Sequence, residues 1–439
     1  MNNLRLLAMA LCVSLPSALS CLSAEQPRVM TLEEIFASAE SSGIQLKPWI
    51  TATDEAERET AVARANQLPD ISVTASVSYI GDGFTTARNY SDYQRAPIPH
   101  LGTGLGVTVS QPVYAGGAIL NGIKLAELKN TAARYTADLQ RTNLRFRLTG
   151  FYLDIYKCHN LKAVVEANIA AAEKVLEQML SRHEQGTALQ NDITRYELLV
   201  SNLRLQLTHI VNTMNILNHD LVTTAGLPEG TYVVPDTTIL AGALPVDGEA
   251  QWQQEAAANS PQLKLAANSV EISKKAIDLA KSERRPKVAI QAGWTMDGPI
   301  LVEVPPINRN LSYWYIGVGL NYNLSSLFKS NKSIAKAEVA KTRATEELDA
   351  RTEDLRMAVR ADYIHYLEAY DDLKTRTKSL ELATDNYRIT SMRYSADMAL
   401  LTDMLDAANA RLDAEQQLVN ARIDILYYYY KLLFTSGKI

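Results

Sequence analysis

Residues 182–192, Arg-His-Glu-Gln-Gly-Thr-Ala-Leu-Gln-Asn-Asp, have a counterpart in residues 393–403, Arg-Tyr-Ser-Ala-Asp-Met-Ala-Leu-Leu-Thr-Asp. When the chain is placed over itself at an offset of 211 residues, residues 182–226 match residues 393–437 at nine positions without a gap. Ordinary composition would give about three or four chance identities. The matched pairs are Arg182/Arg393, Ala188/Ala399, Leu189/Leu400, Asp192/Asp403, Gln206/Gln417, Leu207/Leu418, Leu221/Leu432, Thr224/Thr435 and Gly226/Gly437. We therefore expect an internal duplication.

Two kinds of matched residue are typical of helix ends. The paired aspartates stand where a helix would start, and the paired glycines stand where one would stop. The strand-like run Leu105-Gly-Val-Thr-Val-Ser has a counterpart at the same offset in Ile316-Gly-Val-Gly-Leu-Asn. The repeat therefore includes strands as well as helices.

Composition limits the function classes. The chain has 439 residues, 47% of them hydrophobic and 21% charged, with a net charge of −5. It lacks the Lys and Arg excess of a nucleic-acid-binding protein. Residues 1–20 combine an early Arg5, the apolar run Leu6 to Leu15 and small residues before Cys21, which predicts a secretory signal peptide. Cleavage before Cys21 also resembles a lipoprotein site, so Cys21 is either a lipid anchor or a residue beside an ordinary cleavage site.

After the signal no run of 18 apolar residues occurs, which argues against a transmembrane helix. Four segments of bilayer length alternate in strand fashion, with Trp and Tyr near their ends as on membrane barrels. These are residues 71–80, 104–114, 288–296 and 313–324. Four strands cannot close a barrel, and open edges in lipid cost several kcal/mol per unpaired group. Either several copies share one barrel, or the sheet is not in a membrane.

The rest of the chain predicts helices, because Ala, Leu, Glu, Lys and Arg abound and internal Pro and Gly are scarce. Residues 118–182 and 330–393 predict two helices of about 65 residues, or roughly 95 Å each. Four helices of about half that length are predicted at residues 32–67, 192–225, 251–283 and 403–436. Each long helix would turn near Gly186 or Asp397 and be matched along its length by two half-length helices.

Bilayer-length strands followed by very long helices, all duplicated, resemble the TolC family of bacterial outer-membrane efflux proteins. The motif Tyr394-Ser-Ala-Asp-Met-Ala-Leu-Leu-Thr-Asp403-Met-Leu-Asp406-Ala is similar to the family's helix-turn-helix pattern. Gln111-Pro-Val-Tyr-Ala-Gly-Gly, leading from strand into helix, is similar to a second family hallmark. The resemblance covers the whole mature chain.

The resemblance implies an α + β membrane protein in which a homotrimer builds one 12-stranded β-barrel and a long α-helical periplasmic barrel. It implies a passive duct in the bacterial outer membrane, in contact with its lipid, that extends into the periplasm. A periplasmic adaptor would join the duct to an inner-membrane transporter, within a tripartite efflux pump or a type I secretion system. The expected organisation is a signal peptide (1–20), a first repeat (21–227), a linker (228–248) and a second repeat (249–439).

Two other function classes compete. A periplasmic adaptor protein also has a helical hairpin, but such adaptors generally have one hairpin flanked by many soluble strands. An enzyme is less favoured, because the sequence shows no constellation of nucleophile, base or metal ligands, and no cofactor or metal is expected.

Asp403 and Asp406 lie one turn apart, so both carboxylates project to a similar side of the last helix. Taken alone, Asp403 is an N-cap candidate. By resemblance, both line a narrow periplasmic entrance, where three copies would form carboxylate rings that attract cations. Tyr394 matches a family tyrosine that ties neighbouring helices in the closed state, or is simply a packed aromatic.

By the same resemblance, the helix turns meet the adaptor, which makes Gly186, Thr187, Ala188 and Met398 candidate docking residues. Gly186 occupies the family glycine position, where left-handed backbone suits glycine, whereas the second turn has Asp397, which tolerates that conformation better than most residues. Ala399 stands where the best-known member has an arginine, so this chain departs from the family at one closed-state link.

Overall fold

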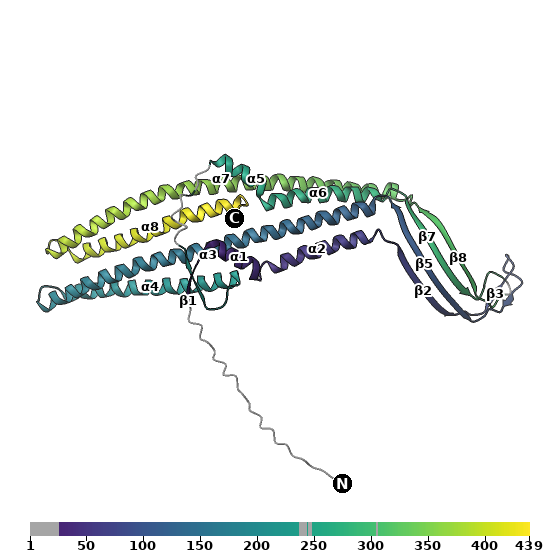
Figure 1. The fold of residues 1–439 in the computed structure, drawn as a ribbon, viewed down its shortest axis with the longest axis horizontal. Helices are drawn as coiled ribbons and strands as arrows, with labels where there is room; N and C mark the ends of the chain where they lie inside the picture. Colours follow the sequence, from purple (N-terminus) through teal and green to yellow (C-terminus); the bar gives the residue numbers. More distant parts are fainter. Residues whose placement is uncertain (1–25, 237–243, 245–247, 304–305) are drawn as a thin grey trace, which may run out of the picture.

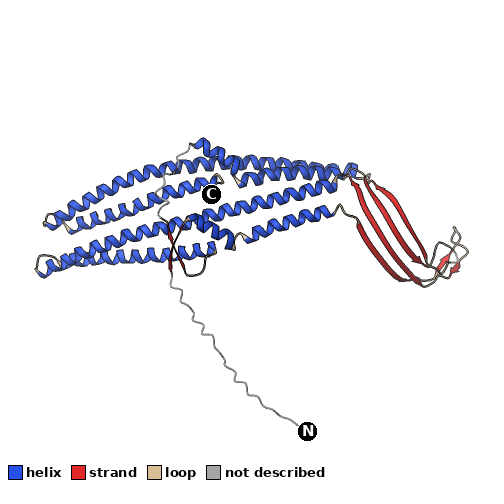
Figure 2. Ribbon diagram, viewed as in Figure 1, coloured by secondary structure: helices blue, strands red, loops and turns tan. Residues whose placement is uncertain are grey.

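The computed structural model describes residues 26–236, 244, 248–303 and 306–439. Over these residues the molecule is elongated: a body of nearly parallel helices ends in a sheet that extends from one end at an angle (Figures 1 and 2). The two helix turns lie at the opposite end of the body. This arrangement separates a sheet end from a turn end.

Two very long helices run the length of the body. Helix α3, Ala118–Glu184, has 67 residues, and helix α7, Ser326–Ser395, has 70. Each turns back into a helix of about half its length, α4 (Gln190–Ala225) or α8 (Leu401–Thr435). The predicted long helices and returning helices are confirmed.

Near the sheet each long helix packs against a second partner. Helix α2, Lys47–Ala65, packs on α3, and α6, Pro261–Ser282, packs on α7. The prediction of single helices over residues 32–67 and 251–283 is wrong, because separate helices α1 (Leu32–Ser42) and α5 (Glu249–Asn259) precede them. At the second break Pro261 is the first residue of α6, a position that suits proline because no backbone donor is needed there.

The four predicted long strands are confirmed. They are β2 (Asp70–Tyr79), β5 (Leu101–Ala115), β7 (Lys287–Gly298) and β8 (Leu311–Asn321), in the spatial order β2-β5-β7-β8 with every neighbouring pair antiparallel. The segment between β2 and β5 contains a short hairpin of β3 (Gly83–Thr85) and β4 (Gln94–Ala96). The central β5–β7 pair joins the two halves of the chain.

The strand register sorts side chains onto two unlike faces of this sheet. Because side chains alternate along a strand, paired residues share a face. One face carries the apolar row Val73–Val107–Trp294–Trp314, two residues from the similar row Ile71–Val109–Ala292–Ile316. The opposite face carries the row Ser72–Thr108–Gly293–Tyr315. The sheet therefore has one continuous apolar face and one more polar face.

A small parallel pair of strands lies near the middle of the helical body. It consists of β1 (Gln26–Met30) and β6 (Thr231–Pro235), and no sequence pattern predicted it. Tyr152 of α3 is 1% exposed and links the two strands: its hydroxyl donates to the Met30 carbonyl at 3.0 Å and accepts from the Asp236 amide at 2.8 Å. Burial raises the pKa of Tyr152 to about 12.

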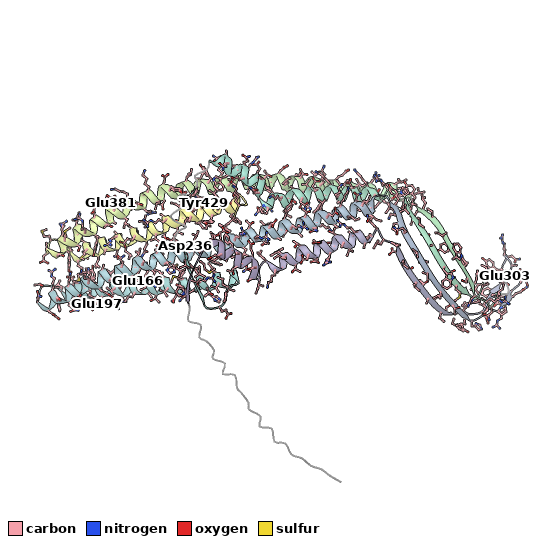
Figure 3. The ribbon with its side chains drawn as sticks, in the orientation of Figure 1. Glu166, Glu197, Asp236, Glu303, Glu381 and Tyr429 are labelled. Carbon is pink, nitrogen blue, oxygen red and sulfur yellow. The ribbon has the colours of Figure 1, made fainter. Side chains whose placement is uncertain are left out.

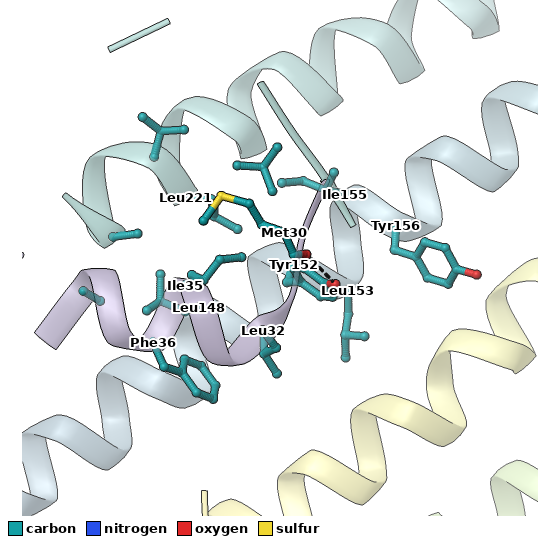
Figure 4. Packing of buried hydrophobic residues seen from close by; sticks show 14 of the residues in the cluster. Met30, Leu32, Ile35, Phe36, Leu148, Tyr152, Leu153, Ile155, Tyr156 and Leu221 are labelled. Carbon is teal, nitrogen blue, oxygen red and sulfur yellow. Dashed lines mark hydrogen bonds between the residues drawn. The ribbon is translucent and has the colours of Figure 1, made fainter. Parts of the chain in front are cut away.

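Tyr152 belongs to the largest apolar core, where β1, α1, α3, α4 and β6 converge (Figure 4). Its members include Met30, Ile35, Leu148, Leu221 and Val233, all nearly or fully buried. The core fixes the N-terminal strand against the first long helix halfway between the sheet and the turns.

Candidate gate at the two helix turns

The turns that join α3 to α4 and α7 to α8 share one backbone geometry. Gly186 has φ +77° and Asp397 has φ +59°, so both occupy the left-handed region at matched positions. Gly186 and Thr187 donate from their amides to His183 and Arg182, at 2.8 and 2.9 Å. The matched amides of Asp397 and Met398 donate to Tyr394 and Arg393, at 3.0 and 2.8 Å. The expectation that Asp397 accepts left-handed geometry is confirmed.

Asp403 is the third residue of α8 rather than its N-cap. The N-cap is Leu400, whose amide donates to Asp403 Oδ2 at 3.2 Å. The N-cap interpretation of Asp403 is therefore wrong by three residues, although the carboxylate still satisfies a free amide of the first turn. Asp192 occupies the same position in α4, which starts at Gln190.

Asp406 follows one turn later on the same helix. Both Asp403 and Asp406 are exposed, and neither makes an ion pair with any other residue that the structure describes. Two exposed, uncompensated carboxylates close to one helix end create a local negative potential.

Tyr394 lies at the junction between the two helical hairpins. It is half-buried and packs against the apolar cluster that holds the turn end together, formed by residues such as Ile169, Ile193 and Met404. Burial raises the pKa of Tyr394, and the nearby carboxylates of Asp192 and Asp397 act in the same direction. The structure thus brings Tyr394 of the second hairpin near Asp192 of the first.

An ion pair joins the two turns directly. Arg182, the third-last residue of α3, approaches Asp397 Oδ1 to 2.6 Å with its guanidinium. The Arg182 side chain is 30% exposed and that of Asp397 is 77% exposed. The sequence prediction missed this contact, although the Arg182/Arg393 identity had marked the position.

The predicted docking residues occupy the outermost part of the turns. Gly186, Thr187 and Met398 are exposed, and Ala188 is half-exposed. The structure adds Leu189 and Leu400, each 70% exposed at the N-cap of its helix. The repeated Ala-Leu pair was the signal that could have identified them.

The turns lie far from the loops of the sheet end. Glu303, between β7 and β8, is at the opposite end of the molecule, whereas Glu197 of α4 lies close to the turn end (Figure 3). Among the described residues no group of His, Cys, Asp and Glu could hold a metal ion, and no helix is both long and apolar enough to cross a membrane. Cys21 and the predicted signal peptide lie outside the described residues.

Comparison with known proteins identifies similar sequences and folds. The family described as "Outer membrane efflux protein" matches residues 252–433. The outer membrane protein TolC of Vibrio cholerae serotype O1 is 22% identical over 400 residues, which cover 90% of this chain and 88% of the relative. The outer membrane efflux protein BepC of Brucella suis biovar 1 is 21% identical over 393 residues, covering 87% of this chain and 80% of the relative.

Solved outer-membrane channels share the fold. The outer-membrane channel OprN superposes with a TM-score of 0.76 at 13% identity, covering 93% of this chain and 90% of that one. The outer membrane protein VceC of Vibrio cholerae gives a TM-score of 0.75 at 14% identity, covering 92% and 96%. With the turn motif and the bilayer-length sheet, these matches show that the chain is similar to the outer membrane efflux proteins of the TolC family over most of its length and shares the fold of outer-membrane channels.

Proposed function

We propose that three copies of this chain form one exit duct through the outer membrane, closing a shared 12-stranded barrel and continuing it into the periplasm as a tube of helices. The observation that carries the proposal is the four-stranded sheet with one continuous apolar face and one more polar face. Such a sheet places the apolar face toward lipid and the other toward a water-filled lumen.

The sheet edges support assembly. Strands β2 and β8 end the sheet, and each pairs on one side only within the described residues. Unpaired backbone groups in a bilayer cost several kcal/mol each, so the edges need partners. Pairing β8 of one copy with β2 of the next satisfies both, and three copies give the strand number implied by the family resemblance.

The two halves of each copy form two repeats, residues 21–227 and 249–439, joined by a linker at 228–248. Strand β6 lies within that linker and pairs with β1, so the linker also fastens the N-terminal segment. Because each copy carries two helical hairpins, three copies carry six, a number that suits a closed helical tube.

The duct acts passively, without catalysis, and depends on an adaptor and an inner-membrane transporter for direction and energy. The exposed turn residues Gly186, Thr187, Ala188 and Met398, with Leu189 and Leu400, form the adaptor-docking end. The alternative that this chain is itself an adaptor is not supported, because the matched relatives are outer-membrane efflux proteins and the structural matches are outer-membrane channels.

The gate lies at the turn end. Three copies of Asp403 and Asp406 ring the narrow entrance, and Tyr394 holds the neighbouring hairpins in the closed state. The exposed, unpaired carboxylates support this assignment, since a multivalent cation can bridge them across the axis.

A planar-bilayer measurement tests the gate. A trivalent cation added on the periplasmic side should block the wild-type conductance, and Asp403→Ala/Asp406→Ala should abolish the block. Asp192→Ala, the matched change in the first repeat, is the control and should leave it intact. Block that persists in the double variant would remove these residues from the gate, and a folded protein that never inserts into lipid would refute the channel.

A further inference from the structure

The junction between β8 and α7 lies where the sheet meets the helices (Figure 1), and it exposes several large apolar side chains. Leu324, in the connection between β8 and α7, is 65% exposed, and Leu327 and Phe328, in the first turn of α7, are 47% and 65% exposed. Exposed large apolar side chains at this level lie next to the apolar face of the sheet. They are placed where a bilayer passes from acyl chains to head groups.

Three lysines follow at once on α7. Lys329, Lys332 and Lys336 are all exposed and, at spacings of three and four, lie along one side of the helix. None makes an ion pair with any residue in the described ranges. Farther from the sheet, by contrast, Lys274 and Lys275 of α6 are paired with Glu271 and Asp278 at 2.5 and 2.7 Å.

The first repeat shows that the fold does not require this composition. At the offset of 211 residues, Leu327 and Phe328 correspond to Gly116 and Gly117, and the three lysines correspond to Ala118, Asn121 and Leu125. At both junctions a long strand is followed by a long helix. The apolar and basic side chains of the second junction therefore need another explanation.

The adjoining end of α6 adds positive charge. Lys281 and Lys287 are exposed and have no ion-pair partner among the described residues. The arginines between them are used within the fold: Arg284 donates from Nε to Ser330 Oγ at 2.8 Å, and Arg285 donates to the Gly116 carbonyl at 3.3 Å. The arginines hold the junction together and the lysines remain free to bind a ligand.

We propose that this surface, Leu327, Phe328, Lys329, Lys332 and Lys336 with Lys281 and Lys287 beside it, binds the head groups of anionic phospholipids in the periplasmic leaflet. We name it the basic collar. The apolar residues enter the edge of the acyl region and the lysine stems extend toward phosphate. The proposal rests on the placement of the sheet in the outer membrane given above.

Lipid association measured in reconstituted bilayers tests the proposal. Spin-labelled phosphatidylglycerol and phosphatidylcholine are compared for the intact protein, for Lys329→Gln/Lys332→Gln/Lys336→Gln, and for Lys174→Gln/Lys264→Gln/Lys374→Gln. The control triple removes the same charge from exposed lysines far from the sheet. Wild type and control should prefer phosphatidylglycerol, and the collar triple should lose that preference by about tenfold.

A salt titration of the wild type needs no variant and should weaken the same preference, since exposed charges are screened. A collar triple that keeps the preference, or a control that loses it equally, would overturn the proposal. Loss of trimer yield with unchanged lipid preference would also overturn it, because the lysines would then serve contacts between copies. Conductance is recorded on every sample, so failure of the channel itself is seen separately from loss of lipid preference.

Discussion

Asp397 shows how one side chain can offset an unfavourable backbone. At φ +59° it occupies a region that glycine enters freely and that other residues enter at a cost of about 1 kcal/mol or more. Gly186 holds the matched position without any side chain. What the second turn gains is a carboxylate that reaches Arg182 of the other hairpin at 2.6 Å. In a chain with Ala399 at the family arginine position, this pair is a link between hairpins.

We expect Arg182→Gln and Asp397→Gly each to raise the resting conductance of the channel and to make its gate easier to open. The pair is exposed on the Asp397 side, so each copy contributes about 1 kcal/mol at most, but all copies act on one gate. Single-channel recording checks this, and the double variant should match either single variant.

Arg393→Gln is the matched control for this prediction. Arg393 is equivalent to Arg182 under the duplication but makes no ion pair with the described residues, reaching only the Met398 carbonyl at 3.4 Å. Equal effects at Arg182 and Arg393 would show that general loosening of the turns, rather than the ion pair, sets the conductance.

At the scale of elements, the ends of the returning helices fit against breaks in other helices. A Cβ on Gly226, at the end of α4, would approach the backbone carbon of Ser42 to 2.8 Å, where α1 ends. A Cβ on Gly437, beyond α8, would lie 3.0 Å from the Asn259 carbonyl, where α5 ends. The glycines therefore stop two helices and also allow close contact with a neighbouring chain segment.

We expect Gly226→Ala to destabilise the protein more than Gly186→Ala. Both residues have positive φ, but a Cβ at Gly186 would meet nothing within 4 Å. Thermal unfolding of the two variants measures how much more stability Gly226→Ala loses than Gly186→Ala. That difference in unfolding free energy isolates the close contact, and we expect it to be about 1 to 3 kcal/mol. Equal losses of stability would show that backbone strain alone accounts for both.

Much of this architecture follows from local sequence patterns. The alternation in the long strands and the length of α3 and α7 are visible in the sequence, because each depends on neighbours a few residues away. The β1–β6 pair was missed because its register joins Gln26 to Thr231, a pairing that no local pattern signals. The α5–α6 break was missed although Ser260-Pro261 is a helix-start signal.

The candidate site, like the fold, was predicted where it depends on local sequence and missed where it depends on how distant segments pack. Gly186 and Asp397 were placed correctly at the turns, because left-handed positions have a strong residue preference. Arg182 and Asp397 are 215 residues apart, and their contact depends on how the two hairpins pack side by side, which the sequence does not specify. The role of Asp403 and Asp406 in a gate stays a prediction.

At the scale of the whole molecule, apolar and polar surface are separated along the long axis. The continuous apolar face is confined to the sheet, whereas the α7 helix beyond it carries 70 residues rich in charge. At 1.5 Å per residue the helical body extends about 100 Å from the sheet. The sheet, with the basic collar at its junction to α7, therefore sets how deeply the protein sits in a bilayer.

The fixing of Met30 to Tyr152 by a 3.0 Å hydrogen bond limits the reach of the N-terminal segment. Cys21 precedes Met30 by nine residues, a span of about 30 Å even when fully extended. Tyr152 lies 34 residues along α3 from Ala118, or about 50 Å from the sheet. We infer that Cys21 itself cannot reach the level of the sheet, so retention in the bilayer depends chiefly on the strands.

Cys21→Ser should therefore leave the protein in the outer membrane fraction at its normal amount, as measured by density-gradient fractionation with Cys158→Ser as the control for general thiol effects. Loss of the protein from that fraction only in the Cys21 variant would contradict this. The mid-body core holds the N-terminal segment near the middle of the helical body, so retention in the membrane depends on the parts of the chain beside the bilayer.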